Sequence, residues 1–217
     1  MNPDGPPPTF GTRLPRTIAL LALFALLIVV AINTLSTPGQ SSSGPVVGEP
    51  TPAFAAPLAL SGVTGDVNVA TGRDQGAAGA RPACELRGPG ILTSCELVDG
   101  APAALAFFVP GRRRCEDELE ALARAARATP GVRVAAVALR GDREKLRRRI
   151  RERGWRFPVA YDRDAILANL YGVAVCPQIT YLLPGGRVQG TTVGEQDEGA
   201  LRASLSRLAA ASGGSTP

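Results

Sequence analysis

The sequence predicts an α/β domain with a mainly parallel central sheet, and two observations lead to this prediction. From residue 101 onward, short apolar runs alternate with segments whose apolar residues recur at helical spacing. Strands joined through helices lie parallel and are connected by right-handed crossovers. The 217 residues are 45% hydrophobic and 20% charged, which suits one packed core with extensions.

The first half of this domain predicts two buried strands, each followed by a helix. Residues 103–109 form a continuous apolar run, as expected of a strand buried on both faces. An amphipathic helix is expected over 115–128, and a second buried strand over 132–139. A very basic helix over 143–153 should end at Gly154, because glycine readily adopts the left-handed conformation that closes helices.

The second half adds a strand, a helix, a hairpin and a final helix. The expected strand is 157–161, and the short helix after it is 165–171. Strands 178–183 and 187–193 flank a Pro-Gly-Gly turn, so we expect them to add an antiparallel hairpin at one side of the sheet. Helix 197–211 closes the β-α-β-α-β-α-β-β-α order.

The N-terminal region predicts a membrane anchor. Residues 17–35 are apolar over about the length that spans a bilayer. Arg13 and Arg16 precede this run, and the next basic residue is Arg73, so the positive-inside rule places 1–16 in the cytoplasm. A cleaved signal peptide is the alternative. Either way, the domain is expected outside the cytoplasm, in an oxidising compartment where cysteines can pair.

The remaining boundaries follow from composition. Residues 36–50 are rich in Ser, Gly and Pro and predict a flexible tether. The domain is then expected over 51–211, with a weakly strand-like segment at 51–69 and a mobile Gly/Ala-rich loop at 70–83. Residues 212–217 predict a disordered tail.

Composition excludes several classes of function. The chain contains no histidine, which removes Cys/His and Ser/His/Asp catalysis and every metal site that needs histidine. The net charge is only +5 and no aromatic residues interleave the arginine clusters, so a nucleic-acid partner is not expected. The four cysteines lack a close Cys-x-x-Cys spacing, so we expect no metal site. We expect no cofactor either.

Cys115 is the leading candidate for a reactive side chain. It stands in the first turn of a predicted helix, directly after three arginines, and both the helix dipole and the positive charges favour a thiolate. Arg112 and Arg114 are candidate substrate-binding residues, because cations at a helix N-terminus suggest that an anion binds nearby. The alternative is a solvated arginine loop beside an inert, buried cysteine.

Four segments together resemble the redoxin group of the thioredoxin-like fold. That group includes membrane-tethered disulfide reductases of the TlpA/ResA type and the alkyl-hydroperoxide-reductase/peroxiredoxin type. Aligned on Phe107 and Glu118, the first cysteine of the group's Cys-x-x-Cys motif falls on Arg112 and the second on Cys115. The resemblance implies that Pro177 is a cis-proline, and it makes Pro177 a candidate substrate-binding residue. The segments are 47–54, 107–118, 157–162 with 171–173, and 175–180 with 185–188.

The cysteine pairings stay open at this point. The resemblance places Cys176, just before the cis-proline, against the motif helix, where it could pair with Cys115; the alternative is a small buried residue. Cys84 and Cys95 bracket a short turn and predict a local structural disulfide, or else a second redox pair that exchanges with Cys115. Four cysteines allow three connectivities, and the sequence does not choose among them.

Three functions follow as hypotheses. The first is thiol–disulfide exchange with protein thiols or disulfides, catalysed by Cys115 and Cys176. The second is a one-cysteine, peroxiredoxin-like antioxidant that uses Cys115 on peroxide. The third is a redox-inactive module that binds a partner. The basic helix 143–153 either binds anionic lipid or an acidic partner, or is a solvated face.

Overall fold

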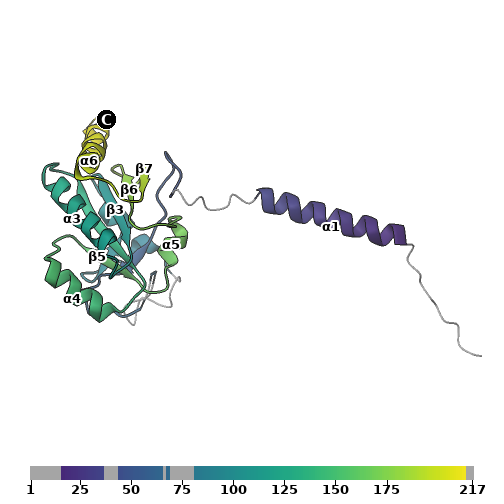
Figure 1. The fold of residues 1–217 in the computed structure, drawn as a ribbon, viewed down its shortest axis with the longest axis horizontal. Helices are drawn as coiled ribbons and strands as arrows, with labels where there is room; N and C mark the ends of the chain where they lie inside the picture. Colours follow the sequence, from purple (N-terminus) through teal and green to yellow (C-terminus); the bar gives the residue numbers. More distant parts are fainter. Residues whose placement is uncertain (1–15, 37–43, 66, 69–80, 214–217) are drawn as a thin grey trace, which may run out of the picture. The chain divides into compact units, whose positions relative to one another are not determined.

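The structure is a computed structural model that describes residues 16–36, 44–65, 67–68 and 81–213. The chain divides into two units, an N-terminal helix and a domain, and each is described by itself (Figure 1). The mobile loop predicted at 70–83 and the tail predicted at 212–217 lie largely outside the described residues.

The N-terminal unit contains helix α1 (Arg16–Ser36). Its described side chains, at 18–30, are all exposed, and many of them are large and apolar. No helix in the described part of the chain combines the length and the apolar character that crossing a membrane requires. The membrane span predicted over 17–35 therefore stays a prediction.

The domain is built on a five-stranded sheet in the order β5-β4-β3-β6-β7. Strand β3 pairs in parallel with β4, and β4 in parallel with β5, whereas β6 is antiparallel to both β3 and β7. The sheet is therefore mixed: β3, β4 and β5 are parallel to one another, and β6 and β7 form the antiparallel hairpin that the sequence predicts at one side. The strands are β3 (Ala103–Phe108), β4 (Arg133–Leu139), β5 (Val159–Asp162), β6 (Gln178–Leu182) and β7 (Val188–Val193).

The length of helix α5 (Ile166–Leu170) explains why β6 runs antiparallel to β3. A five-residue helix advances the chain by only about 7.5 Å, whereas a six-residue strand such as β3 is about 20 Å long. Because α5 does not carry the chain back to the opposite edge of the sheet, β6 begins at the edge where β3 ends. Phe107 near the end of β3 is thus the register partner of Gln178.

Two layers cover the sheet (Figure 1). Alternate residues of β3 point to opposite faces: Ala104, Ala106 and Phe108 to one, and Leu105 and Phe107 to the other. Helices α3 (Arg113–Arg127), α4 (Arg143–Arg153) and α6 (Glu198–Gly213) cover the first face. The second face packs against α5 and against β1 (Ala55–Pro57), β2 (Ile91–Thr93) and α2 (Ser94–Leu97).

The basic helix α4 has the bounds that the sequence predicts. The carboxylate of Asp142 accepts the backbone N–H of Lys145 at 2.8 Å and so caps the first turn. Gly154 closes the helix with a φ of 64°. Both ends are therefore fixed by local chemistry rather than by tertiary packing.

Part of the same helix acts as an internal clamp. Arg143 donates hydrogen bonds to the carbonyls of Leu58, Ala59, Ser61 and Val63. Arg147, one turn later, also donates to the carbonyls of Ala59 and Ser61. These carbonyls belong to an irregular segment that needs donors from elsewhere. The basic helix is consequently not a uniformly solvated face.

Candidate functional site

A disulfide joins helix α3 to the start of strand β6. Cys115 lies in the first turn of α3, just after β3, and Cys176 lies two residues before β6. Their sulfurs are bonded and their Cα atoms are 5.7 Å apart. The Cys176–Pro177 peptide is cis, as the resemblance implies. The antiparallel placement of β6 beside β3 is what brings these two cysteines together.

A buried carboxylate organises the loop before Cys115. Glu116 is fully buried, and its Oε1 accepts the backbone N–H of Gly111 at 2.8 Å. Its Oε2 accepts from Arg149 at 3.0 Å and from Arg153 at 3.1 Å, both on α4. Glu116 therefore ties the loop that carries Arg112 to the neighbouring helix. Sequence analysis missed this role, because a glutamate on an amphipathic helix is ordinarily exposed.

The two bridged cysteines differ in accessibility. Cys115 is buried, with 4% of its surface exposed, whereas Cys176 is only partly buried. Both line a shallow cavity of about 660 Å³, which we call the disulfide cavity. Val109 and Val175 line it as well and are exposed. A molecule that enters this cavity meets Cys176 more readily than Cys115.

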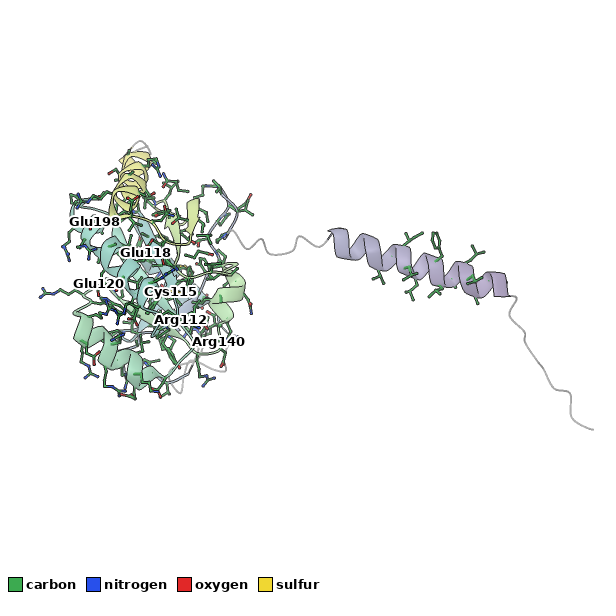
Figure 2. All side chains as sticks on the ribbon, viewed as in Figure 1. Arg112, Cys115, Glu118, Glu120, Arg140 and Glu198 are labelled. Atoms are coloured by element: carbon green, nitrogen blue, oxygen red, sulfur yellow. A yellow bond between two sulfur atoms is a disulfide. The ribbon has the colours of Figure 1, made fainter. Side chains whose placement is uncertain are left out.

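Positive charge surrounds the same cavity. Arg112, Arg113 and Arg114 line it and are exposed on the surface of the domain. Figure 2 labels Arg112 and Cys115 where α3 begins. The N-terminal end of a helix carries partial positive charge, and the arginines add to it. The site therefore favours an anion, either a Cys115 thiolate or an acidic group of a ligand.

Glu118 connects α3 to the segment after β7. Both of its carboxylate oxygens accept the backbone N–H of Gln196, at 2.9 and 3.0 Å. Its side chain is buried, and burial raises the pKa of Glu118 because the ionised form loses solvation; the hydrogen bond from Gln196 opposes this effect.

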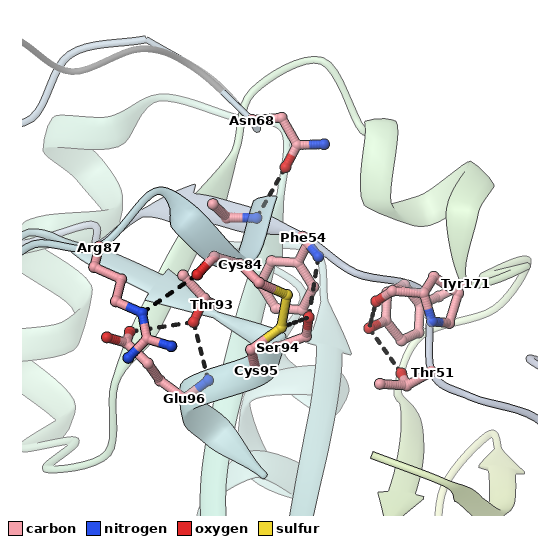
Figure 3. Close-up of a disulfide and its surroundings, with 12 residues drawn as sticks. Thr51, Phe54, Asn68, Cys84, Arg87, Thr93, Ser94, Cys95, Glu96 and Tyr171 are labelled. Carbon is pink, nitrogen blue, oxygen red and sulfur yellow. Dashed lines mark hydrogen bonds between the residues drawn. A yellow bond between two sulfur atoms is a disulfide. The ribbon is translucent and has the colours of Figure 1, made fainter. Parts of the chain in front are cut away.

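The second bridge joins Cys84 to Cys95, whose Cα atoms are also 5.7 Å apart (Figure 3). Cys84 belongs to a single turn of 3-10 helix, η2 (Ala83–Glu85), and Cys95 to α2. Next to it, Ser94 accepts the backbone N–H of Phe54 at 3.0 Å. The four cysteines thus form two pairs, Cys84 with Cys95 and Cys115 with Cys176. That the Cys84–Cys95 pair is a structural disulfide stays a prediction.

Among the described residues, no group of three or more cysteine, aspartate or glutamate side chains is arranged to hold a metal ion.

The fold of the domain is thioredoxin-like. No family model and no curated protein matches the sequence. Solved structures do match: a putative thiol:disulfide interchange protein of Chlorobium tepidum has 19% identity and a TM-score of 0.55, over 77% of this chain and 97% of its own. A putative protein disulfide isomerase of Bacteroides thetaiotaomicron has 15% identity and a TM-score of 0.56, over 78% and 94%.

A third match is the thioredoxin domain of a thiol-disulfide oxidoreductase of Bacteroides vulgatus. It has 14% identity and a TM-score of 0.54, over 76% of this chain and 99% of its own. At these identities the likeness establishes the fold alone, so any activity must be argued from the site.

Proposed function

We propose that this protein is a thiol–disulfide oxidoreductase whose working pair is Cys115 and Cys176. The observation that carries the proposal is the bridge itself: it joins a helix N-terminus to the segment before the cis-proline and borders an open cavity. The names of the similar structures agree with this chemistry. The arginine at position 112 removes the usual first cysteine of the motif, and Cys176 supplies a partner from another element.

Accessibility assigns the two sulfurs different tasks. A substrate thiolate attacks Sγ of the more exposed Cys176, the Cys115–Cys176 bond breaks, and a mixed disulfide forms between the substrate and Cys176. Cys115 leaves as a thiolate, which the helix N-terminus and the neighbouring arginines stabilise. A better stabilised leaving thiolate makes this step faster.

A second thiolate of the substrate completes the reaction. It attacks the substrate sulfur of the mixed disulfide, so the substrate gains a disulfide and Cys176 is released as a thiolate. Two electrons then reside on the reduced Cys115–Cys176 pair. The reverse sequence reduces a substrate disulfide, with Cys176 as the attacking thiolate and Cys115 as the resolving one.

Single-cysteine variants test this assignment. Cys115→Ser leaves Cys176 free, and we expect it to form a mixed disulfide with oxidised glutathione at least about tenfold faster than Cys176→Ser does, because Cys115 is buried. Mass spectrometry of quenched samples measures both rates. Wild-type protein treated with dithiothreitol serves as the control, since its Cys115–Cys176 bridge should open while the domain stays folded.

The outcomes distinguish the hypotheses. Equal trapping rates would refute the assignment of the two tasks. A bridge that dithiothreitol opens only in unfolded protein would refute the oxidoreductase and leave the redox-inactive binding module. Rapid formation of a sulfenate by peroxide at Cys115 in Cys176→Ser would instead favour the one-cysteine peroxidase.

We also propose that residues 17–35 anchor the protein in the cell membrane with the domain outside the cytoplasm. The apolar run, the arginines before it and the exposed apolar side chains at 18–30 support this proposal. Extraction of membranes with alkaline carbonate tests it. Release of the protein into the soluble fraction, or a mature chain that starts near Ser36, would refute the anchor.

A further inference from the structure

The disulfide cavity carries more positive charge than its own acidic group neutralises. Three arginines, 112 to 114, line it together with Glu195. Nε of Arg114 lies 3.6 Å from Oε1 of Glu195, but the two side chains are 86% and 56% exposed, so water screens the pair. Arg112 and Arg113 make no ion pair within the described part of the chain.

The placement of these arginines is unfavourable for the folded domain alone. Arg112 is the N-cap residue of α3, and Arg113 and Arg114 begin its first turn. Cations at this end of a helix oppose the helix dipole and repel one another. An anionic group that docks in the cavity relieves both effects at once.

Apolar surface lies beside the charge. Val109 and Val175 are 37% and 52% exposed, and both line the disulfide cavity with the arginines. Val175 directly precedes Cys176, the more accessible cysteine. A ligand that reaches this sulfur thus contacts an apolar side chain and lies within reach of several guanidinium groups.

We propose that the protein acts on cysteines that stand within acidic, apolar segments of other proteins. This inference rests on the proposed thiol–disulfide exchange and names its substrate class. Carboxylates beside the substrate cysteine complement Arg112, Arg113 and Arg114, and an apolar neighbour covers Val109 and Val175. Basic segments are repelled before their thiol reaches Cys176.

Two peptides that differ only in charge test the substrate class. Each carries one cysteine flanked by valines, with glutamates in one peptide and lysines in the other. Their rates of reaction with the oxidised full-length protein in detergent are compared as a ratio, at one pH and at two salt concentrations. We expect the acidic peptide to react at least about tenfold faster at low salt and the ratio to approach one at high salt.

A matched pair of triple variants tests whether the preference for the acidic peptide comes from the arginines of the disulfide cavity. R112Q/R113Q/R114Q should bring the ratio close to one. R127Q/R148Q/R156Q removes the same net charge from exposed positions that do not line the disulfide cavity, and it should keep the ratio of the wild type. Because each ratio is taken within one variant, a change in the reactivity of Cys115 cancels.

Serine versions of both peptides separate recognition from chemistry. Their binding to the oxidised protein, measured by calorimetry, should show the same preference for the acidic peptide. A wild-type ratio near one, or equal ratios in the two triple variants, would overturn the substrate class while the reaction with dithiothreitol still supports the oxidoreductase. Tighter binding of anionic lipid vesicles than of the acidic peptide at these arginines would also overturn it.

Discussion

Replacing Glu116 by glutamine should destabilise the domain more than its conservative nature suggests. The Glu116 carboxylate is fully buried and accepts hydrogen bonds from Gly111, Arg149 and Arg153. A glutamine can still accept from Gly111, but its amide brings no charge to the two guanidinium groups. Breaking a buried ion pair on one side costs about 3–5 kcal/mol.

The partial exposure of the two arginines lowers this cost. Arg149 and Arg153 are 38% and 21% exposed, so water partly solvates them in the variant. Arg153 keeps its partners Glu120, at 2.7 Å, and Asp117, at 2.9 Å; these hydrogen bonds raise its pKa, so it stays charged. We therefore expect Glu116→Gln to lower the free energy of unfolding by about 2–3 kcal/mol.

Urea unfolding at pH 7 measures this loss. Trp155 is the single tryptophan and is buried, so its fluorescence reports on the domain in the full-length protein. With a slope of about 2 kcal/mol/M, the midpoint should fall by about 1 M or more. The matched control is Glu120→Gln, whose partner Arg153 is shared but whose side chain is 31% exposed; it should lose less than about 1 kcal/mol. Equal losses in the two variants would refute the reasoning.

Two further predictions concern Glu118 and the second bridge. Burial raises the pKa of Glu118 above its ordinary 4.5, so the carboxyl group ionises in the unfolded chain at a lower pH than in the folded one. The free energy of unfolding therefore falls as pH rises from 4.5 through the pKa of the folded state. Glu118→Gln removes this loss, so the urea midpoint of the variant should rise relative to that of the wild type between pH 4 and pH 7. A constant difference over that range would contradict this. Cys84→Ala with Cys95→Ala opens a bridge that spans 11 positions, and chain entropy predicts a loss of about 3 kcal/mol, read as a lower melting temperature with Cys115–Cys176 still oxidised. An unchanged melting temperature would show that this bridge does not stabilise the fold.

Local chemistry explains which elements could be predicted from the sequence. Helix α4 was predicted with both of its ends, because Asp142 and Gly154 act on their own backbone neighbours. Strand β2 (Ile91–Thr93) and helix α2 (Ser94–Leu97) were not predicted, since three or four residues carry no measurable periodicity. The hairpin of β6 and β7 was predicted from the Pro-Gly-Gly turn between them, whereas the order of the strands in the sheet is a tertiary property that the pattern of apolar residues does not encode.

The candidate site likewise contains features that the sequence could predict and features that it could not. Cys115 was recognisable, because a cysteine after a strand and at a helix N-terminus is a local signal. Its bonding partner was not fixed, because the choice among three connectivities required Cys176 to lie at the end of β3. The buried carboxylate of Glu116 left no signal, since its partners Arg149 and Arg153 are more than thirty positions away and resemble other arginines of a basic helix.

The position of the two cysteines changes what reduction does to the domain. In a Cys-x-x-Cys motif both sulfurs belong to one helical turn, so the bond constrains almost none of the chain. Here the bridge spans 61 positions and joins α3 to the segment before β6. Because it lowers the conformational entropy of the unfolded chain, it raises the free energy of unfolding by about 4 kcal/mol. By linkage, folding stabilises the disulfide by the same free energy. The oxidised pair is thus held by the fold, while the arginines favour the Cys115 thiolate that leaves in the proposed reaction. If Cys176 exchanges with a substrate as proposed, the balance of these two opposing effects sets how readily it does so.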